Sequence, residues 1–217
     1  MSGFTIGQAV VGMSNWPETK AGTQVEFISL PAAQLASAPT KVPAATAATL
    51  PLNALTALQA LDILGLAEGD TLAVTGAGGG VGGFAVELAR GRGLEAVGLA
   101  SAQDGEFLTR LGATFVPRSE DPAAALRKVV PGGVDGLLDC AAIGDPVMAA
   151  VRDSGASAAV SLSAEHRQGG YVHLTWGIHD RSPSEAWHFE ATTMHAAGEE
   201  MRNLATEIHA FLTSVAQ

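Results

Sequence analysis

The chain has 217 residues, of which 47% are apolar and 16% are charged, and its formal net charge is −10. This composition can bury a core and excludes a disordered chain, while the acidic balance argues against a nucleic-acid-binding surface, which needs clustered Lys and Arg. Cys140 is the one cysteine, which excludes a disulfide framework and a thiolate zinc site within one chain.

The first residues of the chain bear on its expected cellular location and on its first expected strands. It lacks the charged region and following apolar stretch of an export signal, and no apolar run in the chain approaches the ~20 residues that span a bilayer. We therefore expect a soluble, cytoplasmic protein with no membrane partner. Within residues 1–39 we expect short strands, one of them at 24–28, where polar and apolar side chains alternate.

Residues 42–66 follow a helical pattern. Leucines recur there mostly at spacings of three and four residues, and Gly65 and Gly69 stop the run. We therefore expect a helix that ends just before the next zone of the chain.

Residues 71–162 alternate short apolar strands with helices. The expected strands are 72–75, 96–100, 114–116, 134–139 and 156–162. The expected helices are 81–90, 105–111, 122–129 and 146–151. Such alternation indicates right-handed βαβ units, and uniformly apolar strands indicate a parallel sheet covered on both faces. The predicted fold class is therefore α/β, a Rossmann-type doubly wound parallel sheet.

The residues after 163 differ in composition. All six histidines lie there, but their spacings place at most two, His188 and His195, on one helical face, so we expect no metal site. A strand is expected at 171–175. Residues 182–185, Ser-Pro-Ser-Glu, have the form of a capping box, and apolar residues then recur at spacings of three and four. This pattern predicts a long amphipathic helix, which either packs on the chain's own sheet or forms a homo-oligomer.

Residues 71–90, TLAVTGAGGGVGGFAVELAR, run from a buried strand through a glycine cluster into a helix. Glycines allow the sharp reversal and a close approach of the backbone to a diphosphate, which the free amides and the positive end of the helix dipole favour. Gly78, Gly80 and Gly83 have the spacing of this dinucleotide-binding fingerprint, and Gly76, Gly79 and Gly82 offer an overlapping alternative set. The alternative is a glycine-rich turn without a ligand. A Walker phosphate loop is excluded, because no Gly-Lys-Ser/Thr follows.

The choice of cofactor depends on the end of the second strand, about 20 residues downstream, where an acidic residue would hold the ribose 2′-hydroxyl of NAD. Residues 97–102 contain no carboxylate, and Ser101 can hydrogen-bond a 2′-phosphate, which favours NADP. Asp104 and Glu106 stand where a basic residue would help. Arg118, after the third strand, is the nearest cationic candidate, and a solvated loop arginine is the alternative interpretation.

An ordered set of segments resembles the medium-chain dehydrogenase/reductases, and within them the zinc-free quinone oxidoreductase and enoyl reductase branch. The segments are FTIGQAVVGM, QVEFISLPAAQLASAP, LPLNALTALQAL, GAGGGVG, LGA at 111–113, GGVDGLLDCAAIG and VRDSGASAAVSLS. The first two are similar to the end of the family's GroES-like catalytic domain, the third to the helix before its cofactor domain and the rest to that domain. The short-chain dehydrogenases match the glycine turn too, but their Tyr-x-x-x-Lys is absent, since Thr175 stands four residues after Tyr171, the one tyrosine.

The resemblance implies an NADPH-dependent oxidoreductase that transfers a hydride to a quinone, an enone or another activated double bond without zinc. By position, Asn53 and Thr56 would approach the nicotinamide, and Gly79, Gly80 and Val81 would hold the pyrophosphate, with Gly76 in the same turn. Ser101 would face the adenosine ribose, and Asp139, Cys140 and Ala141 would line the cleft at the carboxyl ends of the strands. Cys140 is expected to be a small buried side chain and not a nucleophile. No catalytic residue is assigned.

The resemblance also implies a division into three parts. We expect a partial GroES-like domain at 1–43, an NAD(P)-binding Rossmann domain at 44–176 and the amphipathic helix at 177–217. Most of the family's catalytic domain is missing from this arrangement, which would impair the enzyme. The alternative function is a non-catalytic nucleotide-binding or oligomerisation module derived from such an enzyme.

Overall fold

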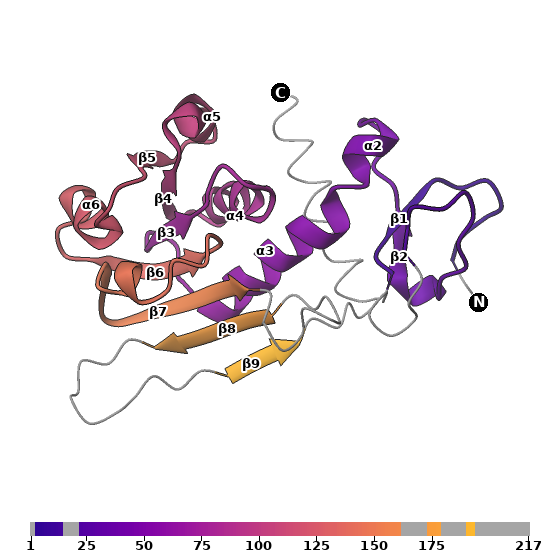
Figure 1. The fold of residues 1–217 in the computed structure, drawn as a ribbon. Coiled ribbons are helices and arrows are strands. Elements are labelled where there is room, and N and C mark those ends of the chain that lie inside the picture. Colours follow the sequence, from indigo (N-terminus) through magenta and orange to yellow (C-terminus); the bar gives the residue numbers. More distant parts are fainter. Residues whose placement is uncertain (1–2, 15–21, 162–172, 179–189, 194–217) are drawn as a thin grey trace. The chain divides into compact units, whose positions relative to one another are not determined.

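The structure is a computed structural model that describes residues 3–14, 22–161, 173–178 and 190–193 (Figure 1). The chain divides into two compact units, one formed by Met1–Leu55 with His195–Gln217 and the other by Thr56–Met194.

The described part of the first unit contains a two-stranded antiparallel sheet. β1 (Val10–Gly12) pairs with β2 (Leu35–Ser37), and a short 3-10 helix, η1 (Ala32–Gln34), leads into β2. The strand expected at 24–28 is wrong, because these residues have no regular structure and Phe27 is 91% exposed. An alternating pattern forms a strand only where a neighbouring strand supplies the hydrogen bonds.

The helix expected at 42–66 forms as two helices. α2 (Ala44–Ala47) is followed by α3 (Leu50–Leu64), which continues from the first unit into the second. Contrary to the expectation from the sequence, Ala44–Leu64 is long and apolar enough to span a membrane, but most of this stretch is buried in the structure. A buried helix in the core of a folded domain has the same length and apolar composition, so these two properties do not identify a membrane span.

A seven-stranded sheet organises the second unit (Figure 1). Its order is β5-β4-β3-β6-β7-β8-β9, with the first five strands parallel and the last two antiparallel. The strands are β3 (Thr71–Thr75), β4 (Glu95–Ala100), β5 (Thr114–Pro117), β6 (Val134–Asp139), β7 (Val151–Ser161), β8 (His173–Ile178) and β9 (Glu190–Thr193). The parallel strands wind outward from β3 in both directions, which confirms the predicted Rossmann-type doubly wound sheet. The switch point lies between β3 and β6, and ligands of such sheets bind at the carboxyl ends of the strands there.

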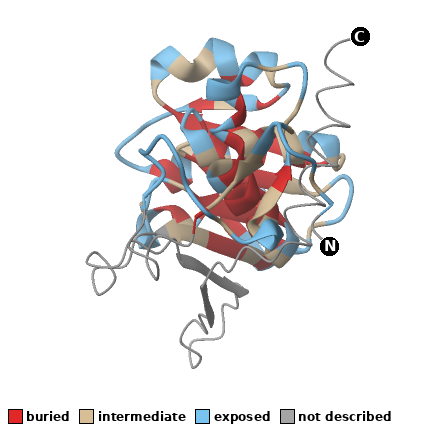
Figure 2. Ribbon diagram, turned by 90° about the vertical axis from the view of Figure 1, so that its right-hand side faces the viewer, coloured by how far each residue is buried: buried red, intermediate tan, exposed pale blue. Residues whose placement is uncertain are grey.

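Helices cover both faces of the parallel strands. They are α4 (Gly80–Gly91), α5 (Gly105–Arg110), α6 (Pro122–Val129) and α7 (Asp145–Met148), with a 3-10 turn, η2 (Ala102–Asp104), before α5. Along β3, Leu72 and Val74 belong to the core cluster that includes α3 and α4, whereas Ala73 belongs to the cluster that includes α6 and α7. Figure 2 shows the buried residues concentrated between these layers. Both faces of β3 are therefore apolar, as a covered parallel strand requires.

β7 joins the parallel strands to the antiparallel pair. Its register against β6 shifts between the Val134–Val151 pair and the Gly136–Ala156 pair, and Ser154 in the intervening bulge has a φ of 64°. Bulges of this kind add residues to one strand and bend it.

The C-terminal elements differ in part from the expectation. β8 overlaps the strand expected at 171–175. β9 lies inside 177–217, so the expected helix is wrong at Glu190–Thr193, where the chain pairs with β8 instead. Two consecutive threonines at 192–193 favour a strand, because β-branched side chains lose rotamer freedom in a helix. The rest of the heptad pattern, at 194–217, lies outside the described residues.

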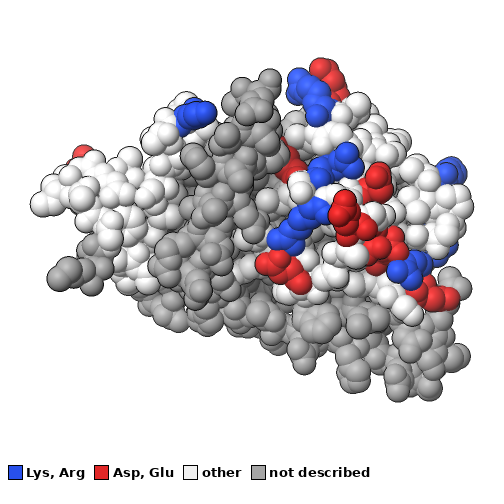
Figure 3. Space-filling model, turned by 180° about the vertical axis from the view of Figure 1, so that it is seen from behind, with Lys and Arg blue, Asp and Glu red and all other residues white. Residues whose placement is uncertain are grey.

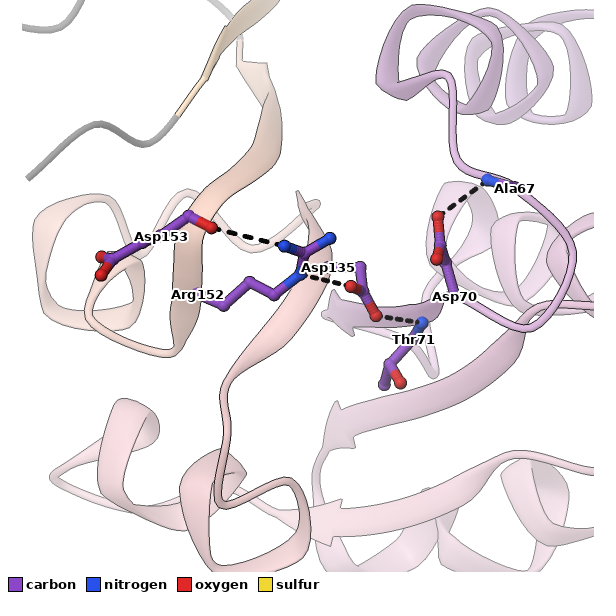
Figure 4. A network of polar contacts seen from close by, with 6 residues as sticks. All are labelled: Ala67, Asp70, Thr71, Asp135, Arg152 and Asp153. Carbon is purple, nitrogen blue, oxygen red and sulfur yellow. Dashed lines mark hydrogen bonds and ion pairs between the residues drawn. The ribbon is translucent and has the colours of Figure 1, made fainter.

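A polar network joins the amino-terminal ends of three strands (Figure 4). Asp135 of β6 accepts a hydrogen bond from the Thr71 N–H of β3 at 2.8 Å and pairs with Arg152 of β7. Partial burial raises the pKa of Asp135, but the hydrogen bonds from Thr71 and Arg152, with the charge of Arg152, outweigh burial and lower the pKa below its usual value. In the preceding loop, Asp70 accepts a hydrogen bond from the Ala67 N–H at 2.8 Å. The network fixes the strand starts at the edge of the sheet opposite the carboxyl ends.

Acidic and basic side chains are mixed on the face shown in Figure 3. Among the described residues, Arg92 pairs with Asp62 at 2.7 Å and Arg110 pairs with Glu106 at 3.6 Å. On that face the described residues form no basic patch of the kind that nucleic-acid binding requires.

Candidate functional site

The glycine cluster forms the bend between β3 and α4. Gly76 has a φ of 59°, a left-handed conformation that favours glycine, and its carbonyl accepts a hydrogen bond from the Gly79 N–H at 2.9 Å. The Gly83 N–H donates to the Gly79 carbonyl at 2.8 Å and closes the first turn of α4. A Cβ on Gly82 would lie 2.8 Å from Ala77 Cα and still closer to the Gly76 carbonyl oxygen. The bend therefore leaves no room for a side chain at Gly82.

The bend presents free backbone amides to solvent. Gly79 is the N-cap of α4 and makes no side-chain cap, so the amides of Gly80 and Val81 have no acceptor within the helix. Gly78, Gly79 and Gly80 are exposed. These amides, with the positive end of the α4 dipole, suit a diphosphate. The structure thus brings the predicted pyrophosphate residues together with Gly76 in one bend.

A buried carboxylate fixes the other side of the switch point. Thr75 ends β3 and Asp139 ends β6; the two are register partners and are 0% and 3% exposed. The Thr75 hydroxyl donates a hydrogen bond to Asp139 Oδ1. The N–H groups of Ala141 and Gly144 donate to the same carboxylate at 3.2 and 2.8 Å. Asp139 therefore holds the loop at 140–144 against the end of β3.

Cys140 lies in this loop beside the bend. A Cβ on Gly76 would lie 3.3 Å from both the Cys140 carbonyl oxygen and Ala141 Cβ, so the loop packs directly on the bend. Burial, and secondly the charge of Asp139, raise the pKa of the Cys140 thiol to about 12. The side chain also packs against the core. Cys140 is therefore protonated at neutral pH and is not an activated nucleophile.

The end of β4 meets the bend through Asp104. Ser101 follows β4, and its hydroxyl donates to Asp104 Oδ2 at 2.6 Å. A Cβ on Gly78 would lie 2.5 Å from the same carboxylate oxygen. Ser101 is the residue that we expect to face the adenosine ribose. It thus lies near the bend, and its hydroxyl is hydrogen-bonded to the carboxylate of Asp104. The sequence places the expected acid within 97–102, and therefore misses the contact between Asp104 and Gly78.

The remaining predicted residues lie on elements other than the bend. Arg118 is exposed, and its N–H donates to the Ala100 carbonyl at 2.9 Å, which places it beside the end of β4. Thr56 is fully buried in α3. Asn53 lies in the first unit, where its side-chain amide donates to the Thr49 carbonyl at 3.1 Å. Contact of Asn53 and Thr56 with a nicotinamide stays a prediction.

The expectation about metal stays a prediction too. Within the part of the chain that the structure describes, no three His, Cys, Asp or Glu side chains gather as metal ligands would. His173 lies in β8, and the other histidines lie outside the described residues.

Curated relatives resemble the chain in sequence, and solved structures share its fold. The chain is 33% identical over 145 residues to the chloroplast envelope quinone oxidoreductase homolog of Arabidopsis thaliana, a match that covers 64% of this chain and 44% of that protein. It is 32% identical over 158 residues to the trans-enoyl reductase himH of Aspergillus japonicus, covering 66% of this chain and 45% of that protein. Among solved structures, an alcohol dehydrogenase superfamily protein from Novosphingobium aromaticivorans matches with a TM-score of 0.70 and 28% identity, over 78% of this chain and 54% of that one. The chain spans less than half the length of these two curated relatives.

The doubly wound sheet and its glycine bend define a Rossmann-type α/β domain. These relatives include quinone oxidoreductases, enoyl reductases and alcohol dehydrogenases, and they confirm the resemblance to the medium-chain dehydrogenase/reductase superfamily that the ordered segments predict. A second family, described as a family of unknown function (DUF6228), matches residues 154–215. This match begins inside β7.

Proposed function

We propose that the chain binds a nicotinamide dinucleotide in the bend between β3 and α4 and is an oxidoreductase of the quinone oxidoreductase or enoyl reductase type. The observation that carries this proposal is the uncapped N-terminus of α4, whose amides at Gly80 and Val81 stand at the carboxyl end of β3. The names of the relatives, a quinone oxidoreductase homolog and a trans-enoyl reductase, support it.

The residues at the switch point fit a dinucleotide in distinct roles. The amides of Gly80 and Val81 would hold the diphosphate at the positive end of α4. Thr75 and Asp139 keep the loop at 140–144 fixed on the far side of the crevice across which dinucleotides lie in such sheets. When bound, the cofactor supplies the hydride for a quinone or another activated double bond. The chain's own residues therefore bind and orient the cofactor.

The finer parts of the proposal rest on the sequence. Independence of zinc follows from the resemblance to the zinc-free branch. The absence of a carboxylate at 97–102 and the presence of Ser101 favour NADPH as long as the sequence alone is considered. A cytoplasmic location is proposed from the composition alone. Self-association would depend on residues 194–217, which lie outside the described residues.

Titration with NADH and with NADPH, followed by nicotinamide fluorescence, tests the binding step. The wild-type chain should change the emission of at least one cofactor, and Gly80→Asp should abolish the change, because the new carboxylate would repel the diphosphate at the amides. Gly132→Asp is the matched control, since this exposed glycine has open space around its Cβ position. No change in emission with either cofactor at millimolar concentration would refute the proposal.

A non-catalytic nucleotide-binding or oligomerisation module is the second candidate. It is favoured by the match of residues 154–215 to a different family. Steady oxidation of either reduced cofactor by para-benzoquinone, lost in Gly80→Asp, would support the enzyme. Cofactor binding without turnover would support the module.

A further inference from the structure

Asp104 places a carboxylate where the end of β4 meets the glycine bend. The turn η2 folds the chain back after β4, and the Asp104 N–H donates to the Ser101 carbonyl at 3.0 Å. Asp104 Oδ2 accepts the Ser101 hydroxyl at 2.6 Å. A Cβ on Gly78 would lie 2.5 Å from that oxygen and 2.9 Å from Asp104 Cβ, so the side chain of Asp104 rests on the bare Cα of Gly78.

The adenosine ribose of a dinucleotide lies at this place in sheets of this class, between the glycine bend and the end of the second parallel strand. A carboxylate there accepts a hydrogen bond from a ribose 2′-hydroxyl. It repels a 2′-phosphate, which carries a charge of about −1.5 to −2. Ser101 does not compensate, because its hydroxyl already donates to Asp104.

We infer that Asp104 is the residue that determines cofactor specificity, and that the chain prefers NADH to NADPH. This inference rests on the proposed function and reverses the preference that Ser101 gives in the sequence. It adds a named residue, three positions beyond Ser101, to the site that binds the cofactor.

Arg118 is the competing determinant. Its backbone is bonded to Ala100 at the end of β4, and its side chain is exposed. A guanidinium that reached a 2′-phosphate would favour NADPH. Among the described residues, however, Arg118 forms no ion pair with Asp104, so the carboxylate at the bend is not neutralised by it.

The experiment compares the dissociation constants of NADH and NADPH in the full chain, measured by nicotinamide fluorescence and by calorimetry. Asp104→Asn keeps the shape of the side chain and one acceptor oxygen but removes the charge. Glu106→Gln, the matched control, removes the same charge two residues further on, from a side chain that pairs with Arg110 at 3.6 Å. Arg118→Ala tests the competing determinant. Circular dichroism checks the fold of each variant, and Asp104→Ser provides a second substitution at the same position.

We expect the wild-type chain to bind NADH at least about tenfold more tightly than NADPH, which corresponds to about 1.4 kcal/mol. Either substitution at Asp104 should reduce this ratio by about tenfold, while Glu106→Gln and Arg118→Ala should change it less than about threefold. A wild-type preference for NADPH, or an unchanged ratio in both Asp104 variants, would overturn the inference and leave the proposed function intact. A wild-type chain that binds neither dinucleotide would overturn both.

Discussion

The hydrogen bond between Thr75 and Asp139 should couple the ends of β3 and β6 energetically. Asp139→Ala leaves the Thr75 hydroxyl and the Gly144 amide without this acceptor, while the Ala141 amide, which also loses it, keeps the Thr75 hydroxyl oxygen at 3.1 Å. A hydrogen bond to a carboxylate contributes about 1.5–3 kcal/mol, and the bonds from the exposed residues Ala141 and Gly144 contribute less than the buried one from Thr75, so the free energy of unfolding should fall by about 4 kcal/mol. Thr75→Val keeps the shape and removes the hydroxyl. Losing a hydrogen bond to a carboxylate costs about 1.5–3 kcal/mol, which the new methyl group partly offsets, so we expect a loss of about 2 kcal/mol.

Urea unfolding of the purified chain, followed by circular dichroism, measures this coupling in a double-mutant cycle. The double variant should lose about 4 kcal/mol and not the sum of about 6 kcal/mol, because the same bond is removed in both single variants. The matched control combines Thr75→Val with Asp135→Asn, which lies on the same strand β6 but at its opposite end. These two losses should add to within about 0.5 kcal/mol. Additive losses for Thr75 and Asp139 would refute the reasoning, since no bond would then connect them.

Two further predictions concern the bend and the strand starts. Gly82→Ala would push a Cβ into backbone atoms of Gly76 and Ala77, so it should lower the free energy of unfolding by about 2 kcal/mol and abolish cofactor binding. Gly91→Ala, in the same helix but with open space at its Cβ position, should raise that free energy by up to about 1 kcal/mol; equal effects in urea unfolding would contradict the reasoning. The lowered pKa of Asp135 means that its network stabilises the fold above the unfolded pKa and loses this contribution as the pH falls through the folded pKa. Asp135→Asn should therefore cost up to about 1 kcal/mol at neutral pH and nothing at about pH 2, and a cost that grew on acidification would contradict this sign.

The parallel strands are predictable because each contains a short apolar run. The strand expected at 134–139 is β6 as observed, and the one expected at 114–116 is β5 with one more residue. β7 begins five residues before the expected 156–162, because its bulge inserts residues that no periodic pattern reveals. For the same reason the helix expected at 146–151 ends at Met148, as the chain after it enters β7. Local pattern thus predicts the existence of elements better than their ends.

The residues of the candidate site also differ in how far local sequence predicts them. The glycine bend is local, and its residues are predictable from one stretch of sequence. Thr75 and Asp139 are 64 residues apart, and their contact follows only from the pairing of β3 with β6, which puts both strand ends side by side. Asp104 depends on tertiary structure even more, because η2 must fold back before the carboxylate reaches Gly78. A search for an acid at the end of β4 therefore overlooks a carboxylate that arrives from the next turn.

The residues of the proposed binding site lie outside the region that matches the second family. The bend, the carboxylate at Gly78 and the loop fixed by Asp139 all lie within residues 71–144. The match to the other family starts at residue 154, in the bulge of β7. The first residues of β7 are held by the ion pair between Arg152 and Asp135, which lies at the amino-terminal ends of the strands, opposite the candidate site. β7 is parallel to β6 on one side and antiparallel to β8 on the other, so one strand completes the parallel sheet and begins the antiparallel pair. The described contacts that shape the candidate site are therefore built by β3, α4, η2 and β6 without any residue of the region that matches the second family.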